Sequence, residues 1–176
     1  MRLLPRSGLR RRPGLPDAAR TMLGLEGAGR VLAWSALAGG GWAAATRSGL
    51  RALLPSGVLI DRPWTDVDRA AWDVDSRTLA VWWVGSRTPT GLEVEQGSFL
   101  PEVVYERVRS SVVLTREVPL PGGKIVTVTL RKADDGTLST QSVPGRGARL
   151  NDPEVAALVA RAVLALRDEA GLPPEG

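Results

Sequence analysis

The hydrophobic period changes within residues 100–132, and this change limits the folds available to the chain. The apolar residues that recur at helical spacing are Leu100, Val103, Val104 and Val108. They predict a helix over residues 100–111, with Pro101 tolerated in its first turn. From Val112 onward apolar and polar residues alternate, first over residues 112–120 and again over residues 124–132. The segment therefore predicts a helix that leads directly into a β-hairpin.

The turn of this hairpin follows from register. A two-residue turn at Gly122-Gly123 would place Val118 opposite Thr127. A three-residue loop that starts at Pro121 places Val118 opposite Val126 instead. Cross-strand partners share one face of a sheet, so the three-residue loop is predicted.

The rest of the chain divides on either side of this segment. Before it lie short apolar runs separated by Gly, Pro and Asp, which predict antiparallel strands at 31–37, 42–46, 50–53, 58–60, 78–84 and 92–95. The uncharged run 31–46 also loosely resembles a signal peptide. However, it is too short to span a membrane and reads as two strands around Gly39-Gly40-Gly41. After the hairpin, residues 138–143 predict a third strand. A final helix is predicted to start at the N-cap Asp152 and to stop at Gly171.

Positive charge is concentrated at the N-terminus. Residues 1–20 carry six arginines and one aspartate, whereas the remaining residues together carry a net charge of −1. We interpret residues 1–29 as a basic mobile arm that contains at most a weak helical turn over residues 17–25. Through Arg10, Arg11 and Arg12 it would contact nucleic acid or an anionic membrane, or it is simply a solvated extension. A further candidate anion or partner contact is Arg116, a charge on the apolar face of the hairpin opposite Val128. The alternative is that its stem is buried while its charge reaches past the sheet edge.

The chain contains no cysteine and no histidine. This excludes disulfides, the usual zinc sites and catalysis by Cys or His, so we predict no catalytic, cofactor-binding or metal-binding residue. Two pairs of aspartates, Asp66/Asp68 and Asp73/Asp75, could hold a cation, but hairpin turns explain them equally well. An enzyme that uses carboxylates alone would need a deep pocket lined by at least two of Asp66, Asp68, Asp73 and Glu93.

All six tryptophans lie before residue 84. The adjacent Trp82 and Trp83 must point to opposite faces of one strand, so one is expected in the core and the other nearer the surface. Two interpretations stay open: a small tryptophan-rich core, or an exposed tryptophan that anchors a partner.

Two resemblances go beyond these patterns. The run of short strands, with Trp64-Thr-Asp-Val-Asp-Arg before the strand at residues 79–84 and a closing helix, looks like a pleckstrin-homology-like (PH-like, GRAM-type) half-barrel over residues 30–111. Residues 31–38, 41–46, 101–116 and 151–157 resemble a family of actinobacterial proteins with no assigned activity. That resemblance implies no catalytic residue.

Together these features predict an α+β protein. Its parts are a basic arm (1–29), a PH-like β-rich unit with a closing helix (30–111), a hairpin with a C-terminal helix packed on that unit (112–172) and a tail (173–176). The expected function is that of a non-enzymatic, cytoplasmic module that binds a protein or a membrane-surface partner. The alternatives are nucleic-acid association through residues 1–20 and an enzyme based on carboxylates. No small-molecule substrate or cofactor is indicated.

Overall fold

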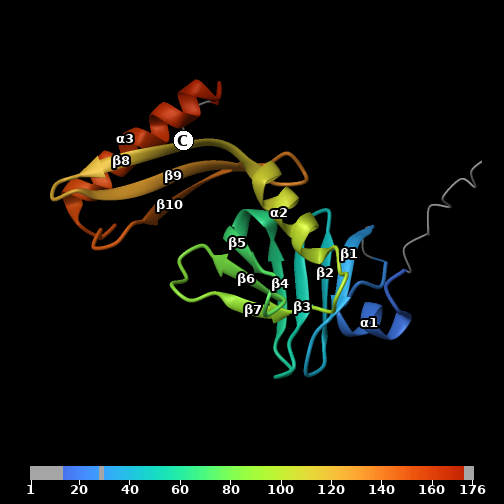
Figure 1. The fold of residues 1–176 in the computed structure, drawn as a ribbon. Coiled ribbons are helices and arrows are strands. Elements are labelled where there is room, and N and C mark those ends of the chain that lie inside the picture. Colours follow the sequence, from blue (N-terminus) through green and yellow to red (C-terminus); the bar gives the residue numbers. More distant parts are fainter. Residues whose placement is uncertain (1–13, 28–29, 173–176) are drawn as a thin grey trace, which may run out of the picture.

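The computed structural model describes residues 14–27 and 30–172 (Figure 1). These residues form an α+β fold with three antiparallel sheets. The elements in chain order are α1 (Asp17–Met22), β1 (Val31–Ala36), β2 (Trp42–Thr46), β3 (Gly49–Leu53), β4 (Leu59–Pro63), the 3-10 helix η1 (Trp64–Asp66), β5 (Val67–Asp73), β6 (Thr78–Trp83), β7 (Thr90–Glu93), α2 (Leu100–Ser111), β8 (Val112–Leu120), β9 (Lys124–Lys132), β10 (Leu138–Pro144) and α3 (Pro153–Glu169). Among the described residues no helix is both long enough and apolar enough to cross a lipid bilayer.

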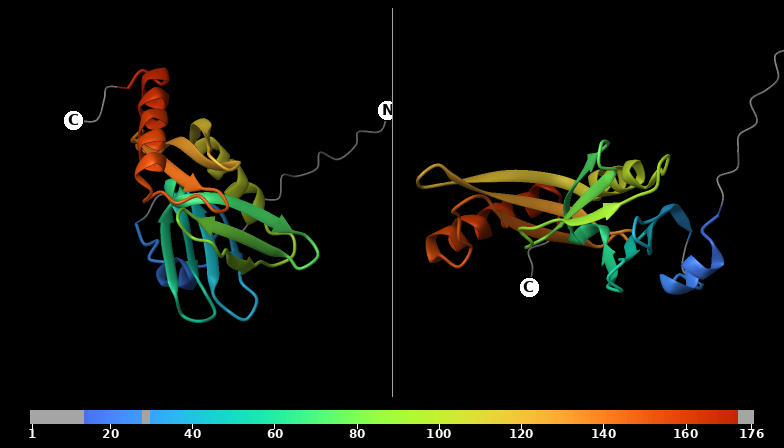
Figure 2. Two further views of the ribbon diagram at one scale, coloured as in Figure 1. Left: turned by 90° about the vertical axis from the view of Figure 1, so that its left-hand side faces the viewer. Right: turned by 60° about the horizontal axis from the view of Figure 1, so that its bottom comes forward.

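Two sheets and helix α2 enclose the first core. The strands follow the orders β1-β2-β3-β4 and β5-β6-β7, and the sheets meet where Leu37 pairs with Val94. Helix α2 lies across β1, β2 and β5 (Figure 2). It buries Leu100, Val104 and Val108 in the same cluster as the side chains of both sheets. The helix predicted over residues 100–111 is confirmed.

The hairpin that follows α2 has the predicted register. Strands β8 and β9 place Leu120 opposite Lys124 and Val118 opposite Val126, so the loop has three residues. Its two glycines have φ angles of 75° and 70°, which residues with a Cβ rarely adopt. Strand β10 extends this sheet on the far side of β9, close to the predicted bounds of the third strand.

Helix α3 covers one face of the β8–β9–β10 sheet and forms a second, separate core (Figure 1). The N-cap is confirmed, because Asp152 Oδ1 accepts a 3.0 Å hydrogen bond from the backbone N–H of Glu154. The helix packs on the sheet with the predicted apolar stripe, which consists of Val155, Leu158, Val159, Ala162, Val163 and Leu166.

Residues 14–27 differ from the predicted mobile arm. They bury Leu15, Ala19, Leu23 and Leu25 around Ala44, on the face of β2 that points away from the first core. The expected helical turn is present as α1, but the segment is packed on the sheet, because the first three of these residues recur at four-residue spacing and share one face. Residues 1–13 of the predicted arm and the tail at 173–176 lie outside the described residues.

Strand β5 was not predicted, so the first unit has seven strands where six were expected. Of the described strands only β6 pairs with it, so it lies at one edge of its sheet, and most of its side chains are exposed. It therefore lacks the clear apolar alternation that identifies a half-buried strand. The candidate cation pair Asp66/Asp68 does not lie on one strand, because Asp66 belongs to η1 and Asp68 to β5.

Candidate functional site

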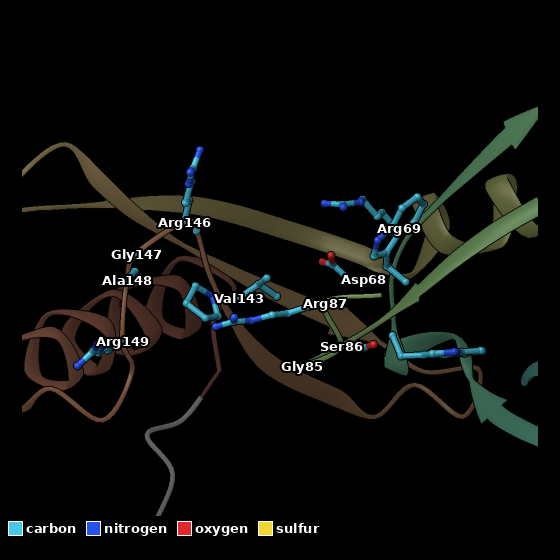
Figure 3. A pocket seen from close by; sticks show the side chains of 14 residues that line it. Asp68, Arg69, Gly85, Ser86, Arg87, Val143, Arg146, Gly147, Ala148 and Arg149 are labelled. Carbon is cyan, nitrogen blue, oxygen red and sulfur yellow. The ribbon is translucent and has the colours of Figure 1, made fainter. Parts of the chain in front are cut away.

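An open cleft of about 850 Å³ lies between the β6–β7 loop of the first unit and the β10–α3 loop of the second (Figure 3). Strand β5 supplies one part of its wall and the end of β10 supplies another. Its lining residues are Asp68, Arg69, Trp82, Trp83, Gly85, Ser86, Arg87, Val143, Pro144, Gly145, Arg146, Gly147, Ala148 and Arg149. The cleft thus joins three parts of the chain that are far apart in sequence.

Four exposed arginines give the cleft its charge: Arg69, Arg87, Arg146 and Arg149. None of them forms an ion pair with a carboxylate of the described residues. In contrast, such ion pairs are formed by Arg47, Arg51, Arg62, Arg107 and Arg116. Asp68 is the only described acidic residue that lines the cleft. Since the chain beyond residue 20 has a net charge of −1, the cleft is a local excess of positive charge.

The arginines approach the cleft from different sides. Figure 3 shows Arg87 extending from the β6–β7 loop toward Val143, while Arg146 and Arg149 project from the β10–α3 loop. The guanidinium carbon of Arg69 lies 4.4 Å from the ring centroid of Trp82, a cation–π contact that holds this arginine on the aromatic wall. An anion in the cleft would therefore meet positive charge on both walls.

The two adjacent tryptophans are both half-buried and both line the cleft, but only Trp83 packs against the first core, as expected for neighbours on opposite faces of one strand. Trp83 is held by a 2.8 Å hydrogen bond from Nε1 to Thr90 Oγ1. Trp64 is the tryptophan buried in the first core, where its Nε1 donates to Thr46 O, and Trp72 is 42% exposed. Trp34 and Trp42 pack against the cluster around Ala44. With Trp64 and Trp83, four of the six tryptophans therefore take part in core packing, and the tryptophan-rich core is confirmed for these four.

A buried guanidinium connects the two units beside the cleft. Arg131 of β9 is 3% exposed and donates to Ser111 Oγ at 2.8 Å and to the backbone carbonyl of Asp68 at 3.0 Å. Burial lowers the pKa of Arg131, and the nearby carboxylate of Asp68 partly offsets this shift. A second tie is the side-chain amide of Gln141, which donates to Thr65 O.

Of the predicted contact residues, the structure describes Arg116 alone, because Arg10, Arg11 and Arg12 lie outside the described residues. Arg116 lies opposite Val128, as predicted, and its Nη2 is 2.9 Å from Glu169 Oε2 of α3. Its charge is thus paired within the chain, and it does not line the cleft.

The candidate carboxylates are also dispersed. Asp66 forms an ion pair with Arg62 at 3.2 Å, and Asp73 Oδ1 accepts backbone hydrogen bonds in the turn after β5. Of the four acidic residues considered for catalysis, only Asp68 lines the cleft. In the part of the chain that the structure describes, no three carboxylates gather as metal ligands.

A smaller apolar cavity of about 310 Å³ lies between β5 and α2. Its lining includes Trp72 and Tyr105, and Glu102 is its only charged residue among those described. Its lining offers little that would select one partner chemistry over another.

The sequence analysis identified one wall of the cleft but not the opposite wall. The basic, glycine-containing loop that holds Arg146 and Arg149 is visible in the sequence, but Arg69 and Arg87 come from segments more than 50 residues earlier. Comparison with models of known protein families, with curated protein sequences and with solved structures finds no match. The two resemblances drawn from the sequence therefore stay predictions.

Proposed function

We propose that this chain is a non-enzymatic module that binds an acidic protein partner in the cleft between the β6–β7 and β10–α3 loops. One observation carries the proposal: four exposed arginines without ion pairs to described carboxylates surround a cleft lined by one described carboxylate. Unpaired arginines on two facing walls can bind carboxylates from a partner without first breaking internal ion pairs.

The shape of the site favours a protein segment over a membrane. The cleft is recessed between two loops that belong to different units (Figure 3). A flat lipid surface contacts what protrudes from a protein, whereas a chain segment can enter a recess. A membrane-surface partner is therefore the less favoured form of this proposal.

The residue types present favour binding over catalysis. The chain has no histidine and no cysteine, and the described lining of the cleft offers one carboxylate rather than an acid–base pair. Arginine stays protonated at neutral pH, which suits it to hold an anion and not to move a proton.

The PH-like identity of residues 30–111 is part of the same proposal. What supports it is the arrangement of this unit: a four-stranded and a three-stranded antiparallel sheet share one core with helix α2. In this proposal the first unit supplies one wall of the cleft and the hairpin unit the other. The cytoplasmic location stays a prediction.

The experiment titrates the full chain with a dye-labelled peptide of about ten residues in which glutamate alternates with threonine, by fluorescence anisotropy. The decisive pair of variants is Arg146→Glu, in the cleft, and Arg161→Glu, on the exposed side of α3, because both change the net charge equally. We expect Arg146→Glu to weaken binding about tenfold and Arg161→Glu by less than about twofold at physiological salt.

Equal weakening by both variants would mean that the peptide responds to net charge alone, and it would overturn the proposal. A variant with Arg10, Arg11 and Arg12 changed to Gln, titrated with duplex DNA and with phosphatidylserine vesicles, examines the alternatives. Tight, steeply salt-dependent DNA binding that this variant abolishes would favour the nucleic-acid function instead.

A further inference from the structure

Among the described residues, no strand pairs with the outer edge of strand β10. The sheet order is β10-β9-β8, so within this part of the chain β10 has a neighbour on one side only. The backbone N–H of Gly145 donates to Ile125 O at 2.9 Å, and hydrogen-bonded pairs alternate along an antiparallel ladder. With the observed register, Val143 and Gln141 bond to β9, while Ser142 and Thr140 direct their backbone groups away from it.

These outward groups are free to bind an added strand. Within residues 14–27 and 30–172, the backbone N–H and C=O of Thr140 and Ser142 and the C=O of Pro144 form no hydrogen bond. Proline has no N–H, so the edge offers donors only up to Ser142.

This edge also lacks the usual protection against strand addition. Exposed edges are commonly blocked by charged side chains, and the other edge strand of this sheet, β8, carries Arg116 and Glu117. No residue of β10 is charged, and Pro144 stands only at its end. An edge of this kind accepts an extended backbone readily.

The edge leads directly into the arginine cleft. Val143 and Pro144 line the cleft, Arg146 follows two residues later, and Arg87 points toward Val143 from the opposite wall (Figure 3). A strand laid along Ser142 would therefore carry its alternate side chains to these arginines.

We propose that the partner binds by strand addition: an extended acidic segment pairs with the outer edge of β10 and places alternate carboxylates against Arg87 and Arg146. This inference rests on the proposed function and specifies its partner. The backbone of β10 supplies the hydrogen bonds, and the arginines select a segment with acidic residues at every second position. A helical partner or a free phosphate would satisfy the arginines but not the edge.

The test uses the full chain and the alternating glutamate–threonine peptide in three forms. One form is unmodified, one is N-methylated at the glutamate nitrogens, and one at the threonine nitrogens. All three carry the same charge, but each methylated form blocks only one edge of the peptide strand. We expect one methylated form to lose about tenfold or more in affinity and the other to stay within about threefold of the unmodified peptide.

The outcomes separate this inference from the proposed function. If all three peptides bind alike, strand addition is overturned while binding of acidic segments stands. If both methylated forms lose affinity alike, the loss is not specific to one peptide edge and strand addition is likewise overturned. If the unmodified peptide does not bind, both proposals fail.

A matched pair of variants tests the same edge on the protein. Ser142→Pro removes an N–H that β9 does not use, whereas Ser142→Ala keeps it. We expect Ser142→Pro to lower the affinity for the unmodified peptide about tenfold and Ser142→Ala to leave this affinity unchanged. Wild-type affinity in a folded Ser142→Pro protein would contradict strand addition. If this variant does not fold, the methylated peptides decide.

Discussion

The guanidinium of Arg131 donates a 2.8 Å hydrogen bond to Ser111 Oγ, which joins the end of β9 to the last residue of α2. The same side chain also reaches the backbone of β5 at Asp68. The two apolar cores are separate clusters of described residues, so this polar contact contributes directly to holding the units in place. Arg131 thus contacts the backbone of Asp68, a residue of the cleft wall, but does not line the cleft itself.

Replacing Arg131 should therefore cost stability. Arg131→Met removes the hydrogen-bond donor to the buried Ser111 Oγ and to the partly buried carbonyl of Asp68. We expect it to lower the free energy of unfolding by about 2 kcal/mol. Urea denaturation measures it, with Arg161→Met on the exposed side of α3 as the control. Equal stability of the two variants would show that the buried contact contributes nothing.

The N-cap of α3 gives a second prediction. Asp152→Ala removes the acceptor for the N–H of Glu154 and should lower the free energy of unfolding by about 1 kcal/mol. Asp152→Ser restores a capping oxygen and should recover most of the loss. If Asp152→Ala and Asp152→Ser both unfold at the same urea concentration as the wild-type protein, the cap does not contribute to stability.

Arg51 holds the α1 segment on the sheet. Its Nη1 donates to the carbonyls of Leu23 and Gly24, and the same guanidinium pairs with Asp61. Arg51→Met should speed hydrogen exchange at the amides of Leu23 and Leu25. Asp61→Asn, which removes only the ion pair, should change that exchange much less. Similar acceleration in both variants would contradict the role of the carbonyl contacts.

Two neighbouring glycines in the β1–β2 turn should respond differently to alanine. Both have positive φ angles, but a Cβ at Gly41 would lie 2.1 Å from Leu53 O, whereas at Gly40 it would meet open space. We expect Gly40→Ala to cost about 1–2 kcal/mol from backbone strain alone, and Gly41→Ala to cost clearly more because β3 must shift. Thermal unfolding of both variants checks the order, and a reversed order would contradict the close approach.

The turn after β5 predicts a dependence on pH. Backbone hydrogen bonds, the largest from Ser76 and another from Asp75, lower the pKa of Asp73. The folded state thus favours the carboxylate. The contribution of Asp73 to stability is fully present above the ordinary pKa of an aspartate. It is lost as the pH falls through the lowered pKa that Asp73 has in the folded protein. Below about pH 4 the wild-type protein should lose stability more steeply than Asp73→Asn, which keeps an acceptor oxygen but does not titrate. Parallel urea midpoints across this range would contradict the prediction.

Local patterns predicted most of the elements but not the site. The α2 helix, the β8–β9 register and the α3 cap follow from period, turn length and capping chemistry within short segments. Strand β5 escaped prediction because an exposed edge strand needs no apolar alternation. The cleft escaped because its charge depends on which arginines already have carboxylate partners. The sequence does not show that Arg116 has a partner in Glu169, while Arg87 has no carboxylate partner among the described residues.

The packing of Leu15, Ala19, Leu23 and Leu25 on β2 decides where this chain can be shortened. A truncation that removes only residues 1–13 takes away five arginines and leaves this cover intact. A shortened chain whose first residue is Leu25 has also lost Leu15, Ala19 and Leu23. It therefore exposes the apolar surface around Ala44 and its neighbours Trp34 and Trp42. Such a shortened protein would aggregate or bind indiscriminately through that surface, and its behaviour would be mistaken for the loss of basic charge. Deletions designed to examine the arginines should end before Gly14.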